Sequence, residues 1–247
     1  MEVAVLGLGE AGGRIAADLA AAGCVVRGWD PARSLGGIAN AASGEEAVRG
    51  ADVVLSINAA AVALDAAVSV ADALAGDALY ADLNTAAPRL KLELAASLPV
   101  QFADVALVGV VASTGLRTPA LASGEGAEHF AGIFGPLGMP VEVVGPHPGD
   151  AAGLKLLRSV FMKGLAAAAV ETLEAAGAAG ARDRLHSEIA AVIGEPLLVR
   201  LLSGTTAHAA RRVDEMRAAA AYLEALGVEP RIASAAADVI QQIRDAE

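Results

Sequence analysis

A lysine, an arginine and a serine stand at helical spacing shortly after residue 150, in a stretch otherwise rich in alanine and leucine. Offsets of three, four and seven residues place four side chains on one stripe of a helix: Lys155, Arg158, Ser159 and Met162. A lysine in apolar surroundings has a lowered pKa, which suits it to give or take an alcohol proton while a hydride moves. We therefore predict that Lys155 is a general acid and base and that Arg158 and Ser159 orient a substrate.

Each member of this stripe also has a structural interpretation. Lys155 can be an exposed lysine on a helix face, Arg158 an ion-pair partner, and Ser159 a hydroxyl bonded within its own helix. Lys163 lies off the centre of the stripe, and we expect it at the surface.

A glycine-rich turn follows the first apolar run of the chain, Val3 to Leu8, and has the pattern GxGxxG. In this pattern Gly7 permits a tight turn, Gly9 lets the backbone approach a pyrophosphate, and Gly12 allows close packing of the following helix. The first N–H groups of that helix face phosphate. A plain turn into a helix is the alternative. The predicted cofactor contacts are Gly7, Leu8, Gly9, Glu10, Ala11 and Gly12.

An acidic residue ends the second apolar run, where dinucleotide-binding domains place the carboxylate that bonds the adenine ribose. Asp30 occupies this position and favours NAD, because a carboxylate repels a 2′-phosphate. Arg27 and Arg33 flank it, and either can turn toward a 2′-phosphate, so NADP is not excluded. As an alternative, Asp30 caps a helix that begins at Pro31.

Two further polar segments follow predicted strands, where a loop faces the crevice that holds the cofactor. Asn58 and Ala59 are expected to pass along the dinucleotide through backbone contacts. Asn84 and Thr85 follow the next strand; their alternative role is an ordinary strand-to-helix cap.

A second polar stripe indicates an anionic substrate. One face of the penultimate predicted helix carries Thr205, His208, Arg211, Arg212 and Glu215. We predict that His208 and Arg211 contact substrate. A solvated face on which Glu215 pairs with one of the arginines is the alternative.

These residues lie on elements that indicate an α/β fold in residues 1–148. Apolar strand patterns alternate with helical ones, as expected of a doubly wound, Rossmann-type parallel sheet covered on both faces. The predicted strands are Val3–Leu8, Cys24–Trp29, Asp52–Ile57, Ala78–Leu83, Val100–Val110 and Val141–Val144, and the predicted helices are Gly12–Ala22, Ala60–Leu74 and Ala127–Phe134.

After Pro146 and Pro148 the strand patterns stop, and residues 149–247 are predicted to form an all-helical domain. Its first helix is apolar on almost every side and needs cover from another layer or subunit, so a homodimer is expected. The predicted helices are Asp150–Gly177, Ala181–Ile193, Pro196–Leu202, Thr205–Leu226 and Pro230–Ala246.

Charge and composition exclude several functions. The 247 residues carry 18 basic and 29 acidic side chains, and the net charge of −11 disfavours nucleic acid and anionic membranes as partners. Although 55% of the residues are hydrophobic, the apolar runs are interrupted early, so no membrane span is expected. Cys24 is the single cysteine and the 4 histidines lack metal-ligand spacing, so we expect no disulfide and no metal site. Without a secretory signal, a cytoplasmic location is expected.

Four segments in order resemble the β-hydroxyacid dehydrogenase superfamily, which includes the 3-hydroxyisobutyrate and 6-phosphogluconate dehydrogenases. They are Gly7–Gly12, Asp82–Pro88 (like DxSTxxP), Phe102–Gly109 (like FxDAPVSGG) and Gly149–Lys155 (like GxGxxxK, with Ala151 for the second glycine). The resemblance implies an NAD(P)-dependent oxidation of a hydroxy acid, with Lys155 as the catalytic lysine. The later segments resemble a branch with a helical carboxy-terminal domain of unknown function.

Two departures leave the substrate open. Val108-Gly109-Val110 stands where the family carries Ser-Gly-Gly to hold a carboxylate, so the serine donor is missing. Arg158 and Ser159 replace two asparagines, and a guanidinium suits a carboxylate or phosphate better than an amide does. We predict substrate contacts from Val108, Gly109, Arg158, Ser159, His208 and Arg211, the last two across a dimer as in 6-phosphogluconate dehydrogenases.

Two other functions are consistent with this pattern. Imine reduction occurs on the same architecture in relatives that lack the lysine, and the presence of Lys155 argues against it. A dinucleotide sensor without catalysis would keep the segment from Gly7 to Asp30 but would have no use for a buried lysine.

Overall fold

The computed structural model describes residues 1–245 and divides into two compact units, Met1–Gly153 and the part from Leu154 onward. The division falls within a helix, after the boundary near residue 148 that the sequence predicts. We describe each unit by itself.

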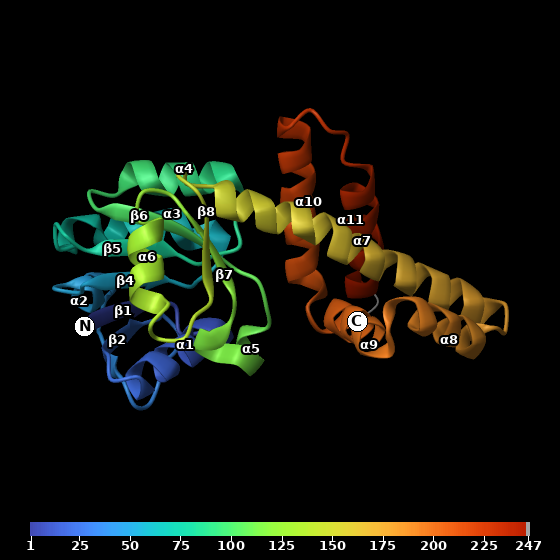
Figure 1. The fold of residues 1–247 in the computed structure, drawn as a ribbon, viewed down its shortest axis with the longest axis horizontal. Coiled ribbons are helices and arrows are strands. Elements are labelled where there is room, and N and C mark those ends of the chain that lie inside the picture. Colours follow the sequence, from blue (N-terminus) through green and yellow to red (C-terminus); the bar gives the residue numbers. More distant parts are fainter. Residues whose placement is uncertain (246–247) are drawn as a thin grey trace. The chain divides into compact units, whose positions relative to one another are not determined.

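The first unit is built on one eight-stranded sheet with the order β3-β2-β1-β4-β5-β6-β7-β8 (Figure 1). The chain runs outward from β1 in one direction and then returns to build the other half from β4, so β1 and β4 flank the switch point of the topology. The strands are β1 (Glu2–Leu6), β2 (Val25–Trp29), β3 (Ala39–Asn40), β4 (Val53–Ser56), β5 (Leu79–Asp82), β6 (Gln101–Leu107), β7 (Ala120–Ser123) and β8 (Val141–Gly145).

One pair of strands departs from the predicted parallel sheet. β6 and β7 are antiparallel, while the other neighbouring pairs are parallel. The predicted strand Val100–Val110 ends at Leu107, and the chain returns from the same edge of the sheet through the short helices α5 (Val111–Thr114) and η2 (Gly115–Arg117). A parallel return needs a crossover long enough to reach the opposite edge, and these short helices do not provide one.

Helices cover both faces of the sheet, as predicted (Figure 1). Residues of α1 (Glu10–Ala21) and α6 (Ala127–Phe134) form one apolar core with the sheet. Residues of α2 (Gly44–Val48), α3 (Ala60–Val70) and α4 (Pro88–Ser97) form the other. The sequence analysis found α1, α3 and α6 but missed α2, α4, α5, β3 and β7, which are short or lack a regular apolar period. A 3-10 turn, η1 (Ala71–Ala73), extends α3.

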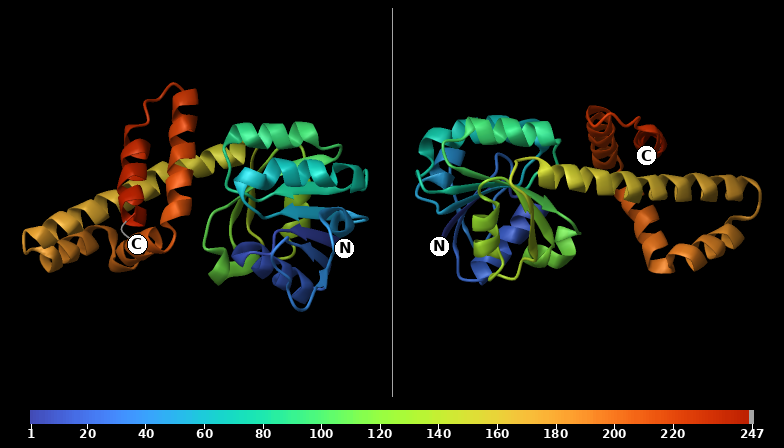
Figure 2. Two further views of the ribbon diagram at one scale, coloured as in Figure 1. Left: turned by 180° about the vertical axis from the view of Figure 1, so that it is seen from behind. Right: turned by 45° about the horizontal axis from the view of Figure 1, so that its top comes forward.

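The second unit is entirely helical within the residues described, as predicted. It contains most of α7 (Asp150–Ala178), followed by α8 (Arg182–Ile193), α9 (Glu195–Ala207), α10 (Ala209–Ala225) and α11 (Arg231–Asp245). α10 and α11 lie side by side (Figure 2), joined by a turn in which Gly227 has a φ of 75°. Leu156 of α7, Met216 of α10 and Ile240 of α11 belong to their common core. Ala246, the last residue of the predicted final helix, lies outside the described residues.

One predicted helix boundary is wrong. The helix predicted to begin at Thr205 begins at Ala209, and Thr205 ends up in α9. His208 separates them with φ −136° and ψ 31°, outside the helical region. Ser203 and Thr205 bond their hydroxyls to carbonyls one turn back, which competes with the helical ladder near this break.

No single helix among the described residues has the length and apolar character of a membrane span. α8 and α9 reach that threshold only together, and they are bent by 114° at their junction.

Candidate active site

The glycine turn lies at the switch point of the sheet. Gly7 follows β1 with a φ of 103°, and a Cβ there would lie 2.3 Å from the carbonyl oxygen of Ile57, at the end of β4. A Cβ on Gly12 would lie 2.0 Å from the Gly7 carbonyl oxygen, so only glycine lets α1 pack this closely against the turn. The structure therefore confirms the tight turn and the close packing predicted for these two positions.

Gly9 differs from these glycines because no atom lies within 4 Å of the position that its Cβ would take. Glycine is therefore not needed here for packing inside the protein, and the open space is available to a ligand. α1 begins at the next residue, and no side chain caps its amino terminus. Its first N–H groups, beginning with those of Glu10 and Ala11, have no acceptor inside the helix and can bond an anion.

The carboxylate of Asp30 holds the glycine turn from the end of β2. Its two oxygens accept hydrogen bonds from the backbone N–H groups of Leu8, at 2.8 Å, and of Ala32, at 2.9 Å. The bond from Ala32 agrees with the alternative role of Asp30 as a local backbone cap. The bond from Leu8 joins Asp30 to the predicted pyrophosphate loop. Arg33 is exposed, and Arg27 donates to the carbonyl of Arg49.

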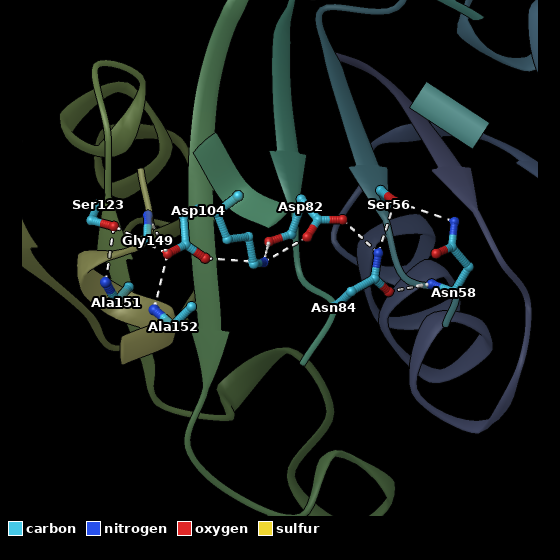
Figure 3. Close-up of polar contacts among 10 residues, drawn as sticks. Ser56, Asn58, Asp82, Asn84, Asp104, Ser123, Gly149, Ala151 and Ala152 are labelled. Atoms are coloured by element: carbon cyan, nitrogen blue, oxygen red, sulfur yellow. Dashed lines mark hydrogen bonds and ion pairs between the residues drawn. The ribbon is translucent and has the colours of Figure 1, made fainter. Parts of the chain in front are cut away.

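The loops after β4 and β5 are joined by the side chain of Asn84 (Figure 3). Its amide oxygen accepts from the backbone N–H of Asn58 at 2.7 Å, and its amide nitrogen donates to Ser56 and Asp82. Asn84 is only 4% exposed, so its side chain organises the loops instead of lying on their surface. Thr85 and Ala59 are exposed beside it. The predicted cofactor residues of both loops are thus brought together next to the glycine turn.

A buried ion cluster lies beneath these loops, and the sequence analysis did not find it. The Lys91 ammonium of α4 lies 2.6 Å from Asp82 Oδ2 and 3.0 Å from Asp104 Oδ1, the two carboxylates labelled in Figure 3. The three side chains are 0% exposed. Burial lowers the pKa of Lys91, but the two carboxylates outweigh it and hold the pKa above its usual value. The signal in the sequence was an acid in each of two adjacent apolar strands, Asp82 at the end of β5 and Asp104 in the middle of β6, because two buried carboxylates require a buried cation.

The second unit holds a different polar cluster around the predicted substrate residues. Ser159 of α7 is buried and donates to the carboxylate of Glu215 in α10 at 2.5 Å, while the Lys163 ammonium bonds both at 3.0 Å and 2.8 Å. Lys163 was predicted to be exposed, but its side chain is 16% exposed. Two helices pack here, and the carboxylate of the second compensates the cation.

This cluster also settles the partner of Glu215. The alternative interpretation paired Glu215 with Arg211 or Arg212 on a solvated face, whereas Glu215 pairs with Lys163 and is 10% exposed. Arg212 instead donates to Thr205 at 2.6 Å across the helix break. The five residues of the predicted stripe therefore do not share one helix face.

The remaining predicted substrate residues occupy separate places. Lys155 is half-buried and Arg158 is exposed on α7. Val108 and Gly109 lie in the loop after β6. His208 and Arg211 are exposed and line a shallow pocket of about 370 Å³ together with Arg244, a cation that the sequence analysis missed.

No group of His, Cys, Asp or Glu side chains in residues 1–245 has the arrangement of a metal site. Cys24, the single cysteine, is partly buried and unbridged.

Comparison with known proteins agrees with this geometry. Residues 2–120 match the NAD binding domain of 6-phosphogluconate dehydrogenase, and residues 176–243 match a domain of unknown function, DUF1932. The chain belongs to the β-hydroxyacid dehydrogenase superfamily. Within the superfamily, the DUF1932 match assigns it to the predicted branch with a carboxy-terminal helical domain.

Several solved structures resemble this chain over nearly its whole length. A conserved hypothetical protein from Sinorhizobium meliloti 1021 is 30% identical, with a TM-score of 0.77, over 98% of this chain and 87% of that one. The conserved protein MTH1747, described as structurally similar to 3-hydroxyacid dehydrogenases, is 28% identical, with a TM-score of 0.78. The match covers 100% of this chain and 98% of that one. The 3-hydroxyisobutyrate dehydrogenase of Mycobacterium tuberculosis is 22% identical, with a TM-score of 0.82 over 98% and 92%, and shows the shared fold.

Proposed function

We propose that this protein is an NAD(P)-dependent oxidoreductase that moves hydride between nicotinamide and the hydroxyl-bearing carbon of a small anionic hydroxy acid. The observation that carries the proposal is the glycine turn at the switch point, with open space over Gly9 and the Asp30 carboxylate beside it. Membership of a dehydrogenase superfamily supports the class of reaction.

The residues of the first unit fit a dinucleotide. Gly9 and the amino terminus of α1 would receive the pyrophosphate, Asp30 the adenine ribose, and the loops of Asn58 and Asn84 the part toward nicotinamide. When bound, the nicotinamide supplies or accepts the hydride. The half-buried carboxylate of Asp30 favours NAD, because a 2′-phosphate next to it would be repelled.

Lys155 is the proposed proton-exchanging group. A neutral amine at this position would take the proton of the hydroxyl oxygen as hydride leaves the carbon that bears it, and the resulting ammonium would return the proton in the reverse reaction. Its position in the GxGxxxK-like segment supports this role.

An anionic substrate is supported by the charges of the second unit. Glu215 is surrounded by cations, since Lys163 pairs with it and Lys155 also lowers its pKa. Arg158, Arg211 and His208 add exposed donors for a carboxylate or phosphate.

A homodimer is part of the proposal. Three large apolar side chains of α7 share one face at helical spacing and are exposed: Leu154 by 46%, Leu157 by 37% and Phe161 by 69%. A second copy covering this face would remove it from water. His208 and Arg211 would then be available to the partner's site.

The test compares wild type with Lys155→Ala. NADH and NADPH binding is measured by fluorescence, and turnover is screened with 3-hydroxy acids, sugar acids, their phosphates and cyclic imines. We expect wild type to oxidise an anionic hydroxy acid, and Lys155→Ala to bind NADH equally well while losing about 10²–10⁴-fold in turnover. Unchanged turnover in the variant would remove the proposed role of Lys155. Binding without turnover of any substrate would favour a sensor, and reduction of imines alone would favour the imine reductase alternative.

A further inference from the structure

The Lys91 cluster has no part in the proposed chemistry, although it is the most buried set of charges in the described chain. Lys91, Asp82 and Asp104 are each 0% exposed, so they cannot touch substrate. One ammonium faces two carboxylates, which leaves an excess negative charge inside the protein. Such a charge is costly unless other donors compensate it.

The compensating donors come from the start of α7. Asp104 Oδ2 accepts from the backbone N–H groups of Gly149, at 3.1 Å, and Ala152, at 2.9 Å. Ser123 donates to the same carboxylate and accepts from the Ala151 N–H at 3.0 Å (Figure 3). The amino terminus of a helix carries a partial positive charge, so Asp104 is held between the Lys91 ammonium and the α7 terminus.

The backbone around Gly149 is fitted to this arrangement. Gly149 has a φ of 101°, and a Cβ there would lie 2.9 Å from the backbone oxygen of Pro88, the first residue of α4. α4 also carries Lys91. The starts of α4 and α7 are therefore packed together without room for a side chain.

The other end of the cluster reaches the cofactor loops. Lys91 bonds both the carboxylate and the backbone carbonyl of Asp82, the carbonyl at 2.9 Å. Asp82 accepts from Asn84, which in turn holds the backbone N–H of Asn58. A continuous chain of contacts thus runs from the loop after β4 to the first turn of α7.

We propose that Lys91 is a positioning residue that couples the cofactor loops to the first turn of α7, the helix that carries Lys155. The ammonium is the only group in this chain of contacts that bonds both acids. Cofactor binding at the Asn58 and Asn84 loops therefore stabilises the Gly149–Gly153 turn, and the two respond together. The coupling to catalysis rests on the proposed function, whereas the physical coupling within the first unit does not.

The alternative is a purely structural role, in which the Lys91 ammonium only neutralises the buried carboxylates. To separate the two, the double variant Lys91→Met/Asp82→Asn removes one positive and one negative charge while keeping Asp104 as the cap of α7. Its matched control is Arg89→Met, which removes an exposed cation from the same helix. Thermal unfolding first shows that each variant is folded.

The deciding experiment is amide hydrogen exchange with and without saturating NADH. In wild type and Arg89→Met, NADH is expected to slow exchange in the segment 149–153 by about fivefold or more, the size of a modest allosteric coupling. In Lys91→Met/Asp82→Asn this slowing should be lost while NADH still binds. Equal slowing in the double variant, or bound NADH without slowing in wild type, would overturn the coupling.

If the wild-type protein does not bind NADH, the proposed function is refuted, but the coupling can still be tested without a ligand. The perturbation is then Asp104→Asn. An asparagine has one accepting oxygen and one donating NH₂ group, whereas Lys91 and the α7 terminus are both donors, so the variant must lose one of the two contacts. Coupling predicts faster exchange at the Asn58 amide, at the far end of the chain of contacts. Faster exchange confined to segment 149–153 would overturn it.

Discussion

The Lys163 ammonium of α7 lies 2.8 Å from the Glu215 carboxylate of α10, and the two side chains are 16% and 10% exposed. This ion pair joins two helices that the sequence could only describe separately. We predict that Glu215→Gln lowers the free energy of unfolding by about 3 kcal/mol, because it leaves the ammonium buried without its counter-charge. Urea unfolding measures this. Glu224→Gln, at an exposed position of the same helix, should change the stability little; equal losses in the two variants would contradict the assignment.

The same pair predicts a loss of stability in acid. Burial raises the pKa of Glu215, but the Lys163 ammonium and the donated hydrogen bonds outweigh it and hold the pKa below its usual value of 4.5. The carboxylate therefore stabilises the fold above the pKa of the unfolded state, and this contribution is lost as the pH falls through the lower, folded pKa. Urea midpoints of wild type and Glu215→Gln should differ at pH 7 and converge as the pH falls from 4.5 through the lower, folded pKa. A constant difference would show that Glu215 does not titrate in this range.

The glycines of the turn should separate folding from binding. Gly7→Ala and Gly12→Ala place a Cβ within 2.3 Å and 2.0 Å of backbone oxygens, so each should destabilise the first unit strongly, by about 3 kcal/mol or more. Gly9→Ala meets no protein atom within 4 Å and should leave the melting temperature nearly unchanged. Its NADH affinity should fall about tenfold or more, because the methyl group enters the space for the pyrophosphate. Calorimetry and NADH titration test both effects, and full NADH affinity in Gly9→Ala would place the cofactor elsewhere.

Asp30 should control the choice of cofactor. Asp30→Asn keeps an oxygen that can accept from the Leu8 N–H but removes the negative charge. We expect the ratio of NADPH to NADH affinity to rise about tenfold, since a hydrogen bond to a charged group and the repulsion of a 2′-phosphate are both lost. Arg33→Ala reports whether the exposed arginine takes part in NADPH binding by the variant. An unchanged ratio in Asp30→Asn would mean that its carboxylate acts only as a backbone cap.

The exposed face of α7 predicts the oligomeric state. Phe161→Glu puts a charge on the proposed dimer face, at its most exposed side chain, and should convert the dimer to a monomer, as measured by light scattering. Val192, on α8, is 83% exposed, and Val192→Glu is the matched control that should leave the dimer intact. A wild-type monomer at micromolar concentration would contradict the proposed dimer.

The amino-acid sequence by itself determined the features that depend on local pattern. The GxGxxG turn, the alternation of strands and helices and the long α7 helix follow from glycine geometry and apolar periodicity, which act over a few residues. The position of Asp30 at the end of β2 follows from the same alternation.

Only the tertiary structure decided which charges meet. Lys91 lies in a segment without a regular apolar period, yet Asp82 and Asp104 on neighbouring strands draw it inside the protein. Lys163 is buried because Glu215, far along the chain, lies on the helix that packs against it. The antiparallel β7 likewise depends on where the chain must return. Charge compensation and strand direction depend on residues distant in sequence, so local spacing could not reveal them.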